Sequence, residues 1–319
     1  MLTAYPPSAR AGAPAGTTVS WFDLLDPSAE ERARVEGACG FELPSREDLS
    51  EIESSSRVHE EGGVLYLSMP VVSRGRSLDD ASSPIGFVLS REVLVTIRYA
   101  QLRPFDTVAA KFSQGGAPGS SIEAFAALTD EMVDWSADLL EGIGAEMDAV
   151  SQSIFVKARG DRRHLTRSND ALHGTLIDLG NAGERLSRIR GSLLGLQRIV
   201  PFASEPPRDW VPEDVRTRLR TAQRDLVSLA DYEAHLSGKV QFLLDAVLGF
   251  INTRQNDIFT VLTVVSVVGI PPTLVASIYG MNFKDMPELS WAWGYPYGLA
   301  VIALSTILPI LWFKWRGWL

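Results

Sequence analysis

Residues 258–278, which read IFTVLTVVSVVGIPPTLVASI, and residues 291–313, which read WAWGYPYGLAVIALSTILPILWF, decide the fold of this chain. Neither stretch contains a formally charged residue. Because a helix rises about 1.5 Å per residue, each stretch is long enough to cross a hydrocarbon core of roughly 30 Å. The two stretches therefore predict a pair of transmembrane helices joined by a short loop, residues 279–290.

The rest of the chain has the composition of a soluble, acidic protein. The 319 residues carry a formal net charge of −9, which argues against a nucleic-acid-binding surface. Cys39 is the single cysteine, so an internal disulfide and a thiolate metal cluster are both excluded. We find no phosphate-binding glycine loop and no histidine pair at metal-ligand spacing. The sequence therefore predicts neither an enzyme nor a bound cofactor.

Changes in hydrophobic periodicity divide the chain into segments. The beginning is rich in Pro, Ala and Gly, alternating strands and short helices follow, and apolar residues then recur every three or four positions. The fold class is an α+β cytosolic domain, a long-helix stalk and two C-terminal transmembrane helices. The predicted order is a disordered tail (1–16), an α/β domain (17–119), a helical hairpin (120–205), the cytosolic part of the stalk helix (206–257), the first span (258–278), an extracytoplasmic loop (279–290), the second span (291–313) and a basic cytosolic tail (314–319).

Local signals in the α/β domain predict individual elements. Residues 19–24 and 64–72 read as strands, and residues 85–89 and 93–98 read as a hairpin. Pro70 predicts an edge position, because proline cannot donate to a neighbouring strand.

The charges around the two spans predict their orientation. Arg254 precedes the first span, Lys314 and Arg316 follow the second, and the loop between them has a net charge of minus one. The positive-inside rule places both chain ends in the cytosol, with the protein in the cell's inner (plasma) membrane. Aromatic side chains typical of membrane interfaces lie at both ends of the second span: Trp291, Trp293, Tyr295 and Tyr297 at one end, and Trp312, Trp315 and Trp318 at the other.

A single helix is expected to run from about residue 213 into the first span, since no proline interrupts it before Pro271. Such a helix would be on the order of 100 Å long. Long helices with an apolar stripe usually pack against copies of themselves. Because two helices cannot enclose a polar route, a pore here requires a symmetric ring of chains.

Polar residues recur along the first span at steps of mostly three or four. A water-filled axis would satisfy them better than lipid. The alternative is that the hydroxyls bond to carbonyls of their own helix. The residues are Asn256, Thr260, Thr263, Ser266, Thr273, Ser277 and, beyond the helix, Asn282. Pro271 and Pro272 predict a kink within the same span.

The loop that follows carries a recognisable motif. Tyr279-Gly280-Met281-Asn282-Phe283 is followed by Met286-Pro287-Glu288-Leu289 and later by Gly294-Tyr295-Pro296. Together with the segment order and the basic C-terminal tail, these residues resemble the CorA family of magnesium channels. The resemblance is sharp over residues 250–319 and only architectural before them.

The resemblance implies a homopentamer with a central pore lined by the first span. Gly280, Met281 and Asn282 match the family's selectivity signature at the outer end. Asn256 and Thr273 match polar pore positions, joined by Thr263 and Ser277 from the polar stripe. Leu262 and Ile270 match apolar constrictions. Phe259 stands where many relatives carry methionine, and it either narrows the pore or packs between helices.

The expected function is gated influx of Mg²⁺, with Co²⁺ and Ni²⁺ as further candidate ions. Mg²⁺ prefers to keep its water, and neutral Asn282 amides could bind that water without stripping it. Glu288 would attract cations to the mouth, or be a solvated loop charge. The expected partners are further copies of the chain, membrane lipid and divalent cations.

Two alternatives stay open. One is a ZntB-type zinc transporter of the same superfamily, with or without proton coupling, in which isoleucine is typical at the position of Met281. The other is a non-conducting membrane scaffold or sensor. The resemblance also implies regulation by divalent ions, bound between cytosolic domains, that hold the pore shut. The candidate carboxylates are Glu60, Glu61, Asp79, Asp80 and Glu141, and none matches a family site.

Overall fold

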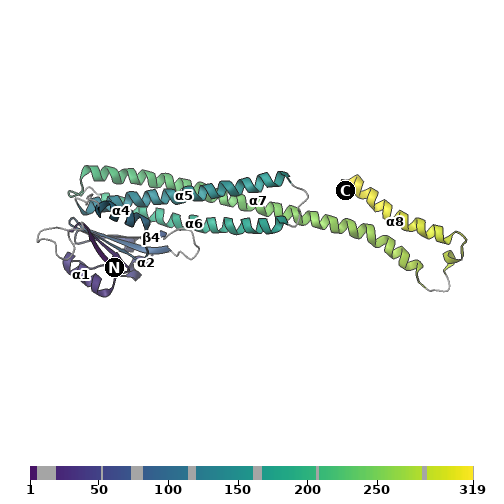
Figure 1. Ribbon diagram of the computed structural model, residues 1–319, viewed down its shortest axis with the longest axis horizontal. Coiled ribbons are helices and arrows are strands. Elements are labelled where there is room, and N and C mark those ends of the chain that lie inside the picture. Colours follow the sequence, from purple (N-terminus) through teal and green to yellow (C-terminus); the bar gives the residue numbers. More distant parts are fainter. Residues whose placement is uncertain are drawn as a thin grey trace. The chain divides into compact units, whose positions relative to one another are not determined.

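The protein is described here by a computed structural model covering residues 1–5, 19–51, 53–72, 82–113, 120–160, 167–205, 208–281 and 286–318 (Figure 1). The chain separates into two compact units, Met1–Leu244 and Asp245–Leu319. The finer segment boundaries given above remain predictions. The helices are α1 (Ala29–Cys39), α2 (Arg46–Ser50), α3 (Ser54–Arg57), α4 (Arg103–Ser113), α5 (Ser121–Gly160), α6 (Arg167–Ser204), α7 (Glu213–Tyr279) and α8 (Gly294–Arg316), with a 3₁₀ turn η2 (Pro287–Ser290) before α8.

The first unit contains a six-stranded sheet in the order β1-β2-β6-β5-β4-β3. The β2–β6 pair is parallel, and the other neighbouring strands are antiparallel. The strands are β1 (Leu2–Tyr5), β2 (Trp21–Leu25), β3 (Val58–Glu61), β4 (Val64–Val72), β5 (Ser82–Leu89) and β6 (Leu94–Arg98). The predicted hairpin is therefore confirmed as β5 and β6.

Helices cover both faces of this sheet. On one face Leu24 and Val88 pack with Val35 of α1 and Leu49 of α2. On the other face the Phe87 ring contacts those of Phe105 in α4 and Phe125 in α5. Figure 1 shows α4, α5 and α6 together on the side of the sheet away from α1 and α2. The alternation of strand side chains thus builds two separate apolar cores.

The predicted edge position of Pro70 is wrong for the strand as a whole, because β4 lies between β5 and β3. β3 pairs only with residues Val64–Leu67 of β4. Pro70 therefore has a strand partner on one side alone, Pro84 of β5, which is the local setting in which a sheet tolerates proline.

The expected disordered tail over residues 1–16 is wrong for its first residues. Leu2–Tyr5 form β1, which pairs with β2, while residues 6–16 lie outside the described part. The Tyr5 ring stacks on Trp21 at 4.5 Å between centroids, and this buried aromatic contact holds the strand to the sheet edge. The Pro, Ala and Gly that follow hid this short strand in the sequence.

The helices α5 and α6 and the first part of α7 form a bundle that completes the first unit. The Val215, Leu219 and Leu226 side chains of α7 are buried in this bundle. Polar contacts join α7 to its neighbours, with Arg218 to Asp130 at 2.6 Å and Lys239 to Asp148 at 2.6 Å on α5. The predicted helical hairpin corresponds to α5 and α6, and the predicted long helix to α7.

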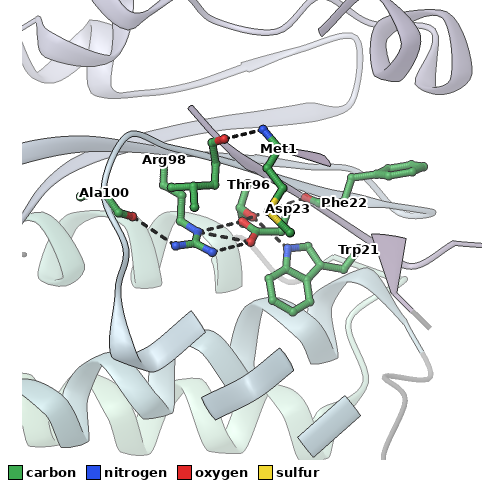
Figure 2. Close-up of polar contacts among 8 residues, drawn as sticks. Met1, Trp21, Phe22, Asp23, Thr96, Arg98 and Ala100 are labelled. Carbon is green, nitrogen blue, oxygen red and sulfur yellow. Dashed lines mark hydrogen bonds and ion pairs between the residues drawn. The ribbon is translucent and has the colours of Figure 1, made fainter. Parts of the chain in front are cut away.

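One buried ion pair fixes the parallel strands together (Figure 2). The Asp23 carboxylate of β2 accepts from the Arg98 guanidinium of β6 at 2.8 Å and from the Thr96 hydroxyl at 2.8 Å. Thr96 Oγ1 accepts in turn from the Trp21 indole N–H at 2.9 Å. The two charged side chains are only 6% and 7% exposed, so each depends on the other for compensation.

Replacing Asp23 by alanine should destabilise the first unit strongly. The substitution leaves the buried Arg98 charge unpaired, a change that typically costs about 3–5 kcal/mol. Chemical denaturation of the detergent-solubilised full chain, followed by tryptophan fluorescence, measures the loss. Glu92→Ala, which removes an exposed carboxylate between β5 and β6, is the control and should change stability by less than about 0.5 kcal/mol. Equal effects of the two substitutions would refute this role of the ion pair.

Candidate functional site

The second unit contains the two helices that are long and apolar enough to cross a membrane, α7 in its C-terminal part and α8. In the most apolar 18-residue stretch of α7 no residue is buried, and in the corresponding stretch of α8 only 6% of the residues are buried. A water-soluble protein does not normally leave helices of this apolarity uncovered. The α8 helix begins at Gly294, three residues later than the predicted second span, because η2 and residues 291–293 form a turn before it.

The first span keeps its helix through the proline pair. The α7 helix continues without a break from Glu213 to Tyr279, with Pro271 and Pro272 inside it. The predicted kink remains a prediction.

Four of the candidate pore residues lie one above the other on α7. Asn256, Thr263, Ile270 and Ser277 follow one another at intervals of seven residues, which is close to two full turns. Their side chains are exposed, and so is that of Thr273. The geometry of α7 therefore aligns polar groups along one face of a helix that is otherwise apolar.

The hydroxyl groups on this face donate to their own helix. Thr263 Oγ1 donates to the Phe259 carbonyl at 2.7 Å, and Ser277 Oγ donates to the Thr273 carbonyl at 2.8 Å. Thr273 Oγ1 donates to the Ile270 carbonyl at 2.8 Å. The sequence left two alternatives for these hydroxyls, a water-filled axis or bonds to their own helix. Within a single chain the structure shows the bonds to the helix. The bond fixes each hydroxyl proton and leaves the oxygen lone pairs directed outward as acceptors.

The candidate constriction residues are large, apolar and uncovered. Phe259, Leu262 and Ile270 are 64%, 60% and 62% exposed. Val261 and Val265, on other faces of the same helix, are each 64% exposed. Exposure within one chain therefore does not distinguish a pore-facing side chain from one that contacts lipid or another helix.

The candidate selectivity signature begins where α7 ends. The Gly280 N–H donates to the Ala276 carbonyl at 3.0 Å, and the Met281 N–H donates to the Ile278 carbonyl at 3.2 Å. A Cβ atom at Gly280 would lie 3.2 Å from the Ala276 oxygen, so the closely packed backbone at the end of α7 favours glycine. Met281 is 46% exposed. Asn282 lies outside the described residues.

A compact turn leads from the loop into α8. Glu288 is half-buried in η2, and its carbonyl accepts from the Trp291 N–H at 3.4 Å. A Cβ atom at Gly294 would lie 2.2 Å from this same carbonyl oxygen. The close approach admits only glycine. The sequence names Gly294 only as part of the Gly294-Tyr295-Pro296 motif, and sequence reasoning missed its positioning role, although Pro296 is a signal for the first turn of a helix.

Gly294→Ala should therefore displace the loop that carries Glu288. The added methyl group overlaps the Glu288 carbonyl, and relief requires the backbone to move. Gly298→Ala is a matched control one turn along α8, since nothing lies within 4 Å of its Cβ position. In reconstituted vesicles, ion flux should fall at least several-fold for Gly294→Ala and stay near the wild-type value for Gly298→Ala. Equal flux through both variants would contradict the proposed constraint.

The candidate regulatory carboxylates do not form a metal centre in the part of the chain that the structure describes. No group of three or more His, Cys, Asp or Glu side chains able to hold a metal occurs there. Glu60 is instead paired with Arg208, with Oε2 3.0 Å from the guanidinium. Glu61 and Glu141 are exposed, and Asp79 and Asp80 lie outside the described residues.

Comparisons with known proteins agree with this architecture. Residues 16–315 match the family model described as CorA-like Mg²⁺ transporter protein. The chain is similar to the magnesium transport protein CorA of Escherichia coli, with 33% identity over 300 residues, 94% of this chain and 92% of the relative.

Solved structures share the fold. The CorA magnesium transporter of Methanocaldococcus jannaschii matches with a TM-score of 0.74 at 17% identity, over 94% of this chain and 91% of that one. The ZntB cytoplasmic domain of Vibrio parahaemolyticus matches with a TM-score of 0.53 at 12% identity, over 73% of this chain and 88% of that one.

Proposed function

Since the chain belongs to the CorA-like Mg²⁺ transporter family, we propose that it is a gated channel for Mg²⁺ across the inner (plasma) membrane. The observation that carries this proposal is the aligned face of α7, where Asn256, Thr263 and Ser277 lie in line with the apolar Ile270. Both chain ends would lie in the cytosol and the loop after α7 outside, as the distribution of Lys and Arg predicts.

The uncovered helices support an assembly of several copies. The Thr263 and Ser277 hydroxyls donate within α7, but their oxygens can still accept from water, and one pair of spans cannot surround water on all sides. A ring of chains that turns Asn256, Thr263 and Ser277 toward a common axis encloses that water. The family resemblance favours a homopentamer, in which the apolar remainder of α7 faces other helices and lipid.

The chemistry of the stripe suits an ion that keeps its water. Mg²⁺ dehydrates reluctantly, so its bound water molecules present hydrogen-bond donors to the wall. The hydroxyl groups of Thr263, Thr273 and Ser277 already donate hydrogen bonds to carbonyls of the helix, so toward water their oxygens can only accept. Asn282 side chains at the mouth would add amide oxygens of the same kind, and Glu288 would raise the local cation concentration.

The apolar positions supply a gate. Rings of Phe259, Leu262 and Ile270 would bind neither water nor ions, and a narrow ring of this kind closes by losing its water. Small movements of α7 are then sufficient to open or close the route.

The zinc-transporter alternative differs in ion and in driving force. The ZntB domain shares the fold of the first unit, which carries no information on the ion. Met281 and the Met286-Pro287-Glu288-Leu289 sequence favour magnesium over zinc. Co²⁺ and Ni²⁺ are proposed as further permeant ions.

Asn282→Ala should lower Mg²⁺ flux into proteoliposomes by about tenfold or more. One hydrogen bond to a charged hydrate is worth about 1.5–3 kcal/mol, and ~1.4 kcal/mol corresponds to a factor of ten. A fluorescent Mg²⁺ reporter inside the vesicles measures the rate. Asn181→Ala, on α6 of the first unit, removes the same amide elsewhere and should leave flux unchanged.

Two results would count against this function, and a third against the role of Asn282. Zn²⁺ uptake driven by a pH gradient without Mg²⁺ uptake would favour the zinc transporter. Absence of any ion flux from the folded protein would favour a scaffold. Unaltered conduction in Asn282→Ala would remove Asn282 from the mechanism.

A further inference from the structure

The last turn of α8 is folded into a defined cap, residues Trp312–Trp318. Gly317 adopts the left-handed conformation, with φ 75°, and ends the helix. The Gly317 N–H donates to the Lys314 carbonyl at 3.2 Å, and the Trp318 N–H donates to the Phe313 carbonyl at 3.0 Å. These two bonds reverse the chain and bring Trp318 back over the helix.

Aromatic rings pack around one buried side chain in this cap. Phe313 is 1% exposed, and its ring centroid lies 5.6 Å from that of Trp318 and 5.1 Å from that of Trp312. The outer rings remain open, because Trp312, Trp315 and Trp318 are 47%, 82% and 49% exposed. The cap therefore presents two indoles packed on Phe313 and a third, that of Trp315, which is almost fully exposed.

Positive charge is placed among these rings. Lys314 and Arg316 are exposed, and in the described part of the chain neither forms an ion pair. The Arg316 guanidinium lies 5.5 Å from the Trp312 ring centroid. No acidic residue follows Glu288 in the sequence. Compensation of the helix dipole accounts for cations in a last turn, but not for three exposed indoles beside them.

We propose that the cap binds the headgroup of an anionic phospholipid. Lys314 and Arg316 would contact its phosphate, while the indoles would lie at the glycerol level, where amphipathic rings are favoured. The inference rests on the proposed membrane placement of α8. It adds a specific lipid class as a ligand of this protein, bound by charge complementarity.

Brominated lipids test the proposal on the full chain in vesicles. Vesicles of phosphatidylcholine with a minor fraction of phosphatidylglycerol are prepared in two forms. In one form the phosphatidylglycerol is brominated, and in the other an equal amount of the phosphatidylcholine is brominated. The difference in tryptophan quenching between the wild-type protein and Trp315→Phe measures the contact of brominated lipid with the cap. Two cations near a surface should enrich phosphatidylglycerol at the cap by about fivefold or more over phosphatidylcholine. High salt should reduce the enrichment, because it screens exposed charges.

Charge removal supplies the decisive comparison. Lys314→Gln combined with Arg316→Gln should abolish the preference for phosphatidylglycerol. Arg34→Gln combined with Arg91→Gln removes the same charge from exposed sites in the first unit and should preserve it. Equal quenching by both lipids in the wild-type protein, or an unchanged preference in the Lys314 and Arg316 variant, would overturn the proposal. So would the absence of quenching by either lipid, which would mean that protein covers the cap.

Mg²⁺ flux measured in the same vesicles separates this inference from the proposed function. Flux without a lipid preference overturns lipid binding and leaves the channel standing. A lipid preference without flux overturns the channel and leaves the cap as a lipid-binding surface.

Discussion

Backbone hydrogen bonding within a single helix is the constraint on which this protein depends. Hydrocarbon offers no partner for N–H and C=O groups, so a chain can enter it only where these groups are satisfied internally. The α7 helix meets this condition from Glu213 to Tyr279, even though Pro271 and Pro272 each remove a donor. The same helix is packed among α5 and α6 at its start and uncovered at its end.

Side-chain hydrogen bonds follow from the same constraint. Thr263, Thr273 and Ser277 donate to carbonyls of α7, which stabilises them in an apolar setting and also fixes which part of each hydroxyl faces outward. Satisfaction within the helix and a role in the pore are thus compatible. Back-bonding leaves the oxygen as an acceptor, and an acceptor is what the water around a divalent cation requires.

The sequence predicts the helices better than it predicts their ends and connections. Absence of charge and regular apolar spacing are strong signals, and the long helix and the β5–β6 hairpin follow from them. β1 was missed because four residues beside a Pro- and Gly-rich stretch give little periodicity, and Tyr5 is buried only through its contact with Trp21. The need for glycine at 294 is likewise a property of tertiary structure, since it arises from the Glu288 carbonyl. In the proposed ring of chains, the direction in which a side chain faces depends on the other copies, and exposure within one chain does not give it.

Cysteine accessibility along α7 tests the central claim most directly. With Cys39→Ser as background, single cysteines at Thr263, Ser277, Val261 and Val265 are treated with a water-soluble thiol reagent while Mg²⁺ flux is recorded. If α7 lines a wet central route, the reagent blocks flux at Thr263 and Ser277 and leaves it unchanged at Val261 and Val265. Block at the two valine positions, or no block at any of the four, would contradict a pore lined by this face of α7.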